Sequence, residues 1–215
     1  MVQPDLVNEA SIESAYQKSG NALGWRLLAS PEETLKGADV AFVGLNPGGK
    51  VDDPSHPRFA VPGKSAYIDE SWNGFPPGQS PLQKQVRKLF QMLRVVPEEV
   101  LSGNLVPFRS PTWNALPSKR SALDFGFELW RQILERAKPS LVVGMGGDAT
   151  RQLARLLRAD TSERIPLGWG KVTGTRAAHA QGYLVGLPHL SRFPVVGRQA
   201  SEAGLRKLFG SSWHL

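Results

Sequence analysis

Short β-forming runs alternate with amphipathic helical segments along this chain, and that alternation restricts its fold more than any other feature. It is typical of a parallel sheet covered by helices. Each predicted strand ends in Gly, Pro or Asn, so four loops should leave the carboxyl ends of the strands, where open α/β sheets bind ligands. The predicted strands are Val40–Leu45, Asn104–Val106, Leu141–Met145 and Tyr183–Leu187.

Apolar residues at helical spacing predict the covering helices. The clearest pattern runs through SPLQKQVRKLFQML, behind a Ser80 cap and with Pro81 in the first turn. A second helix is expected from about Leu123 to Ala137. The segment DATRQLARLLRA follows the third strand directly, and a last helix should run from Glu202 to Phe209 and stop at Gly210.

Length and composition favour one domain that stays in the cytoplasm. We expect residues 1–215 to form a single domain, with 1–37 as an N-terminal extension packed on it. No apolar run approaches the roughly 18 residues of a membrane span, and the first residues lack the features of a signal peptide. We therefore expect a cytoplasmic, monomeric protein without a membrane partner.

Two further features of the composition bear on chemistry. The chain has no cysteine, which excludes disulfides, thiolate nucleophiles and cysteine-bound metal or iron–sulfur sites. Its net charge is +7 and its pI about 9.9, which favours a polyanionic partner such as nucleic acid, although a solvated basic face would give the same balance.

Four loop motifs follow the predicted strands, and each alone has an ordinary interpretation. GLNPGG around Asn46 could be a tight turn, and NLVPF at Asn104 a short strand with a capping residue. GMGGDATRQL could be a glycine loop that binds phosphate at a helix start; it lacks the third glycine of a dinucleotide site. LPHLSRF places His189 just past a strand end, although a lone histidine is more often structural.

Taken in order, the motifs resemble those of the uracil-DNA glycosylase superfamily. GLNPG is similar to its first motif, Phe59 to the aromatic residue about a dozen positions later, Asn104 to its base-reading asparagine, and HLSRF to its His-Pro-Ser loop. FPPGQSPLQKQ and GMGG are similar to its proline-rich and phosphate-pinching loops. The resemblance covers about residues 38–210 and implies a three-layer α/β/α fold with a central, mostly parallel four-stranded sheet.

The resemblance also implies roles. Asn46 would hold the attacking water, and His189 would donate a hydrogen bond to O2 of the departing base. Gly44, Leu45, Gly48, Phe59 and Asn104 would form the base pocket. Contacts with DNA would come from Ser80, Gly146, Gly147, Leu190, Ser191, Arg192 and Phe193. Phe193 stands where the family places its wedge, with Leu190 as the competitor.

The expected function is therefore a DNA repair glycosylase that flips uracil out and hydrolyses its N-glycosidic bond with an activated water, leaving an abasic site. It would act on DNA containing uracil as a monofunctional enzyme, with no metal and no cofactor. Asn46 replaces the aspartate of the most studied branch, which predicts a slower enzyme. Gly48 omits that branch's tyrosine wall, so damaged or 5-substituted uracils are credible secondary substrates.

Other functions stay open. One is a glycosylase for another deaminated base, hypoxanthine or xanthine. Another is a catalytically weak protein that binds DNA lesions on the same scaffold, and a more remote one is a nucleotide-binding regulator that uses GMGG. Asp52, Asp53 and His56 could assist catalysis, but we favour a solvated turn for the two acids.

Overall fold

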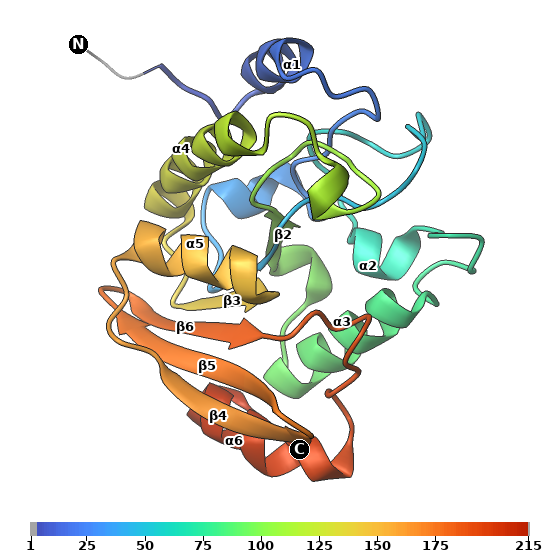
Figure 1. Cartoon of the computed structure of the whole chain (residues 1–215). Helices are drawn as coiled ribbons and strands as arrows, with labels where there is room; N and C mark the ends of the chain where they lie inside the picture. Colours follow the sequence, from blue (N-terminus) through green and yellow to red (C-terminus); the bar gives the residue numbers. More distant parts are fainter. Residues whose placement is uncertain (1–3, 215) are drawn as a thin grey trace.

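A mixed six-stranded sheet lies between two layers of helices (Figure 1). The computed structural model describes residues 4–214. Within the sheet the strand order is β2-β1-β3-β6-β5-β4, and the first four of these strands are parallel. The α/β class is thereby confirmed, but the sheet has six strands instead of four. The strands are β1 (Val40–Gly44), β2 (Leu101–Asn104), β3 (Leu141–Met145), β4 (Glu163–Trp169), β5 (Val172–His179) and β6 (Gly182–Leu187).

The second parallel strand lies earlier in the chain than its sequence predicts. It ends at Asn104, whereas the pattern placed its start there. The pairing with β1 nevertheless continues past its end, because the amides of Leu105 and Val106 donate to the carbonyls of Gly44 and Leu45 at 2.9 and 2.8 Å. The predicted apolar run is thus buried beside β1, and the offset moves Asn104 to the edge where the loops begin.

The two additional strands form an antiparallel hairpin next to β6. The alternation of Ile165 and Leu167, followed by Gly170 at a positive φ of 52°, is a signal for such a hairpin. Pro166 lies within β4, although proline cannot donate to a ladder. At β4, which is the last strand of the sheet, that restriction costs little.

The sequence predicts the positions of four helices, α3 to α6, to within a few residues. Ser80 and Gln83 form a reciprocal capping box at the start of α3, and Gly210 ends α6 as predicted. The helix predicted from about Leu123 starts four residues earlier, at Lys119. The short helices near the N-terminus and before α3 were not predicted. The helices are α1 (Glu9–Lys18), α2 (Ala66–Asp69), α3 (Pro81–Leu93), α4 (Lys119–Ala137), α5 (Gly147–Leu157) and α6 (Glu202–Phe209).

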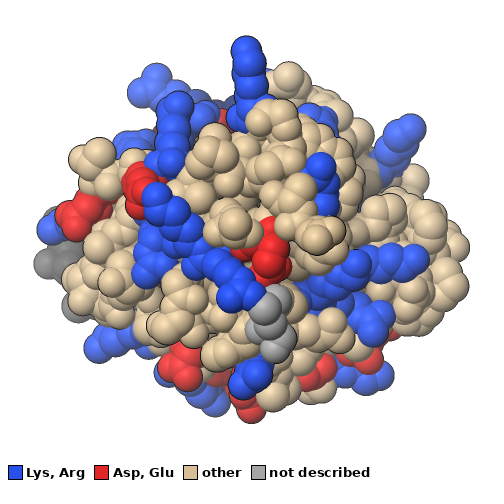
Figure 2. Space-filling view, turned by 90° about the horizontal axis from the view of Figure 1, so that it is seen from below, with Lys and Arg blue, Asp and Glu red and all other residues tan. Residues whose placement is uncertain are grey.

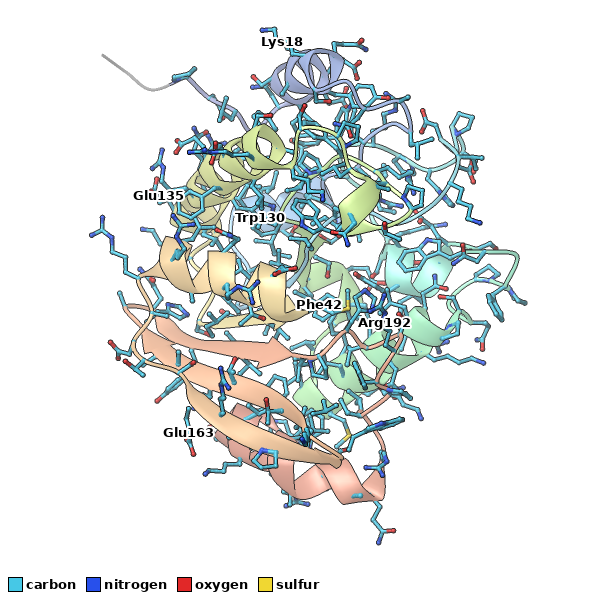
Figure 3. The ribbon with its side chains drawn as sticks, in the orientation of Figure 1. Lys18, Phe42, Trp130, Glu135, Glu163 and Arg192 are labelled. Atoms are coloured by element: carbon cyan, nitrogen blue, oxygen red, sulfur yellow. The ribbon has the colours of Figure 1, made fainter. Side chains whose placement is uncertain are left out.

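The core is divided between the two faces of the sheet. Phe42 on β1 packs with α3 and α6 residues on one face, whereas Ala41 and Val43 pack with α4 on the other. This division follows from the alternation of side chains along a strand. Trp130 of α4 is the largest fully buried side chain, and its indole N–H donates to the carbonyl of Asn104 at 2.7 Å (Figure 3).

The segment before β1 lies against the edge of the parallel strands. Its backbone bridges β2 at Leu28 and Gly103, and Leu27 and Ala29 donate to Arg58 and Ser102. This segment is therefore part of the packed fold, while the division of the chain at residue 37 stays a prediction. No helix among residues 4–214 is long and apolar enough to cross a membrane.

Candidate functional site

Four polar loops meet at one edge of the sheet. Asn104 ends β2, and Asn46, Gly146 and His189 follow β1, β3 and β6; the four strands are neighbours in the order β2, β1, β3, β6. Because these strands are parallel, their carboxyl ends all lie at the same edge, toward which the β6 arrow points in Figure 1. The motifs are thus brought together by strand order although they are far apart in the sequence.

Asn104 presents an unpartnered amide beside a glycine. Gly44 lies opposite Asn104 in the β1–β2 register, and a Cβ on Gly44 would come within 2.8 Å of Asn104 Oδ1. The absence of that Cβ makes room for the amide. Within the described part of the chain, neither Oδ1 nor Nδ2 of Asn104 has a hydrogen-bond partner, and the side chain is half-buried. Both groups are available to a ligand.

Asn46 is half-buried and is held by its amide nitrogen. Nδ2 donates to Ser110 Oγ at 2.8 Å, to Pro47 O at 3.1 Å and to Phe108 O at 3.4 Å. No described residue donates to Oδ1. The arrangement directs a carbonyl oxygen away from the protein contacts, which is the group needed to hold a water molecule.

His189 is exposed and has one side-chain partner. Its Nδ1 lies 2.8 Å from Ser191 Oγ, and its carbonyl accepts from the amides of Arg192 and Phe193. The surrounding protein desolvates the ring enough to lower its pKa below the ordinary 6.5, and the charge of Arg192 lowers the pKa further. Both effects favour the neutral imidazole.

The remaining residues of the final loop differ in exposure. Leu190 is fully buried in the core, which argues against it as a wedge or a DNA contact in this conformation. Phe193 is half-buried, and its ring meets Trp169 edge-to-face at 6.2 Å. Ser191 and Arg192 are exposed; Arg192 is labelled in Figure 3. The loop therefore presents Arg192 and part of Phe193, while Leu190 anchors it.

Other predicted contacts are placed less favourably. Phe59 is only 8% exposed and lies in the core cluster of the α4 face, so little of its ring is accessible. Ser80 is 2% exposed, and its hydroxyl caps α3, which leaves it unsuited to contact DNA. Gly146 and Gly147 lie at the start of α5, where a Cβ on either would come no closer than 3.8 Å to the atoms around it, but the Gly146 amide already donates to Leu187 O at 2.8 Å.

The loop after motif one is partly occupied by charged groups. Asp53 accepts from the amide and hydroxyl of Ser55, as expected for a solvated turn, and Asp52 pairs with Arg58 at 2.7 Å. His56 lies 3.8 Å from the partly buried carboxylate of Glu70. These contacts favour structural roles for the two acids.

Two residues near the site were missed by the sequence reasoning. Ser110 is 2% exposed and anchors Asn46, and Arg109 donates to the carbonyl of Gly48 at 2.6 Å. Burial and the nearby Arg26 charge lower the pKa of Arg109. The sequence FRS after NLVPF has no distinctive spacing, and only knowledge of the turn that brings it to Asn46 would have identified either residue.

The match to known families covers most of the chain and the whole site. A sequence model of the Uracil DNA glycosylase superfamily matches residues 31–208. The chain belongs to this superfamily. Membership supports a glycosylase-type hydrolase that works on DNA in repair, as the ordered motifs predicted.

Other known proteins resemble this chain only weakly. No curated protein sequence matches it. A solved structure described as the "putative tRNA synthase from Salmonella typhimurium LT2" is similar at 14% identity and a TM-score of 0.34. That similarity covers 80% of this chain and 42% of the other, so the chain spans less than half the length of that protein.

The surface charge of the chain is mostly positive on one side. Lys and Arg side chains cover more of the α6 side than Asp and Glu do (Figure 2), in keeping with the net charge of +7. Such a field attracts a polyanion at long range. Across residues 4–214, no three His, Cys, Asp or Glu side chains gather closely enough to hold a metal ion.

Proposed function

We propose that this protein excises uracil from DNA by hydrolysing the N-glycosidic bond. The observation that carries the proposal is the pair of asparagine amides on neighbouring strands: Asn104 with both polar atoms free, and Asn46 with its oxygen directed outward. One amide reads a base edge, and the other holds water.

Base reading rests on Asn104. An amide supplies one donor and one acceptor, which match O4 and N3–H of uracil but mismatch the amine of cytosine. Leaving a buried polar group unpaired with the wrong base is the main source of discrimination. Flipping the nucleotide costs a few kcal/mol, least where the base is mispaired or single-stranded, and the pocket contacts must return that energy.

The reaction uses Asn46 and His189. As the bond between C1′ and N1 breaks, the electron pair leaves with the base, whose negative charge spreads onto O2. We assign the Ser191 hydroxyl as donor to Nδ1 of His189, so that Nε2 carries the ring proton and donates to O2. Such a donor is worth roughly 2.7–4 kcal/mol in comparable sites.

Water then completes the hydrolysis. Asn46 holds the water by Oδ1 near C1′, where a C–O bond forms as the sugar becomes cationic. The water's proton passes to the leaving base or to solvent, because an amide cannot accept it. The products are uracil and an abasic site. Positioning replaces base strength in this step, which predicts a slower reaction than with a carboxylate.

A wider choice of bases is the second candidate. A Cβ on Gly48 would meet no atom within 4 Å, so the motif-one loop leaves open space at that position. Bases with an added substituent, or the larger deaminated purines hypoxanthine and xanthine, would use this space.

The test is base release from labelled oligonucleotides followed by alkaline cleavage at the abasic site. We expect cleavage at uracil with the native chain, and at least about 100-fold slower release with Asn104→Ala or His189→Ala, as for loss of a comparable hydrogen-bond donor. Parallel substrates with hypoxanthine, xanthine and thymine define the base range. Absence of release by the native chain, or undiminished release by both variants, would contradict the proposal.

A further inference from the structure

The orientation of the Asn46 amide is determined by the three groups around it. Pro47 O and Phe108 O are carbonyl oxygens, which can only accept a hydrogen bond. The third group is the hydroxyl of Ser110, which can donate or accept. The role of Ser110 therefore decides how firmly the amide is oriented.

The Ser110 hydroxyl already donates a hydrogen bond to another acceptor. Its Oγ lies 2.9 Å from the carbonyl of Thr112, which accepts only, so the hydroxyl proton is directed there. At 2.8 Å from Asn46, the same oxygen must then accept. Three acceptors consequently face Asn46, and of the two ends of its amide only the NH₂ group, with its two protons, can donate to them. The backbone amide of Ser110 also donates to Pro47 O at 3.1 Å, which ties the two loops together.

We infer that Ser110 is a positioning residue for the hydrolytic water, and that its surroundings accept an asparagine at position 46 but oppose an aspartate. This inference rests on the proposed function, because it concerns the water that Asn46 holds. With Nδ2 bound to three acceptors, Oδ1 has one orientation available. The water site is thus built from β1 and from the loop after β2 together.

A carboxylate at position 46 would be repelled by these acceptors. Its second oxygen would face the carbonyls of Pro47 and Phe108 at close range, without a proton between them. Ser110 could turn its proton to the carboxylate, but Thr112 O would then lose its partner. Repulsion of this kind favours the protonated, inactive form of the acid. The stronger base would therefore not produce a faster enzyme in this chain.

The first experiment compares single-turnover rates of uracil release. We expect Ser110→Ala to lower the rate about 10- to 100-fold, the scale expected for a reacting group misplaced by up to 1 Å, with affinity for abasic DNA unchanged within about twofold. Ser110→Thr keeps the hydroxyl and should recover most of the rate. Ser102→Ala is the matched control, because Ser102 is a buried serine on β2 whose hydroxyl has no partner among the described residues.

The second experiment measures Asn46→Asp over a range of pH. We expect its rate to be no higher than that of the native chain at pH 7 and to rise toward alkaline pH as the acid ionises. An Asn46→Asp rate above the native rate at pH 7, or an undiminished rate for a folded Ser110→Ala, overturns the inference.

A third measurement keeps the inference independent of activity. The side-chain NH₂ signals of Asn46, assigned by their loss in Asn46→Ala, should exchange slowly with solvent in the native chain and rapidly in Ser110→Ala. Fast exchange in the native chain overturns the inference even if uracil is released. If no uracil is released but exchange is slow, the proposed function fails while the anchored amide stands.

Discussion

Replacing Gly44 by alanine pushes against the amide of Asn104 without opening a cavity or straining the backbone. The new Cβ would lie 2.8 Å from Asn104 Oδ1, whereas ordinary contacts begin at 3.4 Å, so the amide must move by about 0.6 Å. Its next neighbour, the methyl group of Met145, is already at an ordinary 3.5 Å. The added Cβ would therefore displace mainly the Asn104 side chain.

The expected loss is in activity instead of stability. A misplacement of 1 Å costs on the order of 100-fold, so a shift of about 0.6 Å corresponds to about 15-fold in the single-turnover rate of uracil release. Alanine in a strand is favoured over glycine by roughly 0.5–1 kcal/mol, which offsets the cost of moving the amide. We expect the free energy of unfolding to change by less than about 1 kcal/mol.

Two other glycines provide the controls for this prediction. Gly103→Ala would place a Cβ 2.6 Å from the backbone oxygen of Leu27, which cannot turn aside, and should lower the free energy of unfolding by about 1–3 kcal/mol. Gly37→Ala meets no atom within 4 Å and should change neither quantity. The reasoning is refuted if Gly44→Ala keeps the native rate, or if it loses stability as Gly103→Ala does.

Four more outcomes are expected. Burial raises the pKa of Glu70, but hydrogen bonds from Arg26 and Trp72 outweigh this effect and hold the pKa below 4.5. The stability that the Arg26–Glu70 ion pair contributes is therefore present above about pH 4.5 and is lost as the pH falls through the lowered pKa. Arg26→Met should cost about 3–5 kcal/mol in denaturant unfolding at pH 7. Arg192→Ala should raise the pKa of His189 in an NMR titration, because it removes a positive charge; an unchanged pKa would contradict this. Phe193→Ala should weaken binding to abasic DNA by about 1–3 kcal/mol in fluorescence anisotropy, and equal binding would exclude the ring as a wedge.

The sequence predicts elements that are determined locally. Ser80, Pro81 and the apolar spacing after them locate α3 to the residue, because a capping box and a helical stripe are contained within a few turns. Asn46 could likewise be placed just past a strand end, since glycine and proline mark the turn, whereas the strand predicted to start at Asn104 ends there.

Features that depend on tertiary contacts were not predictable in this way. Pro166 obscured β4, because whether a proline is tolerated depends on the strand having a free edge. The resemblance assigned Phe59 to the base pocket and Leu190 to the DNA contact, but their burial depends on what the rest of the fold packs against them. Ser110 acts only through its contact with Asn46, 64 residues away, which no local pattern records.

The order of the four parallel strands has a consequence for the integrity of the chain. Asn46 and Asn104, the residues proposed to hold the water and to read the base, lie on neighbouring strands although α2 and α3 separate β1 and β2 in the sequence, and His189 comes last, after β6. No fragment that ends before residue 189 holds a complete site, and a cut between β1 and β2 separates Asn46 from Ser110. Base release, the activity proposed above, would therefore report refolding or chain cleavage, because it requires all four strands to assemble in register.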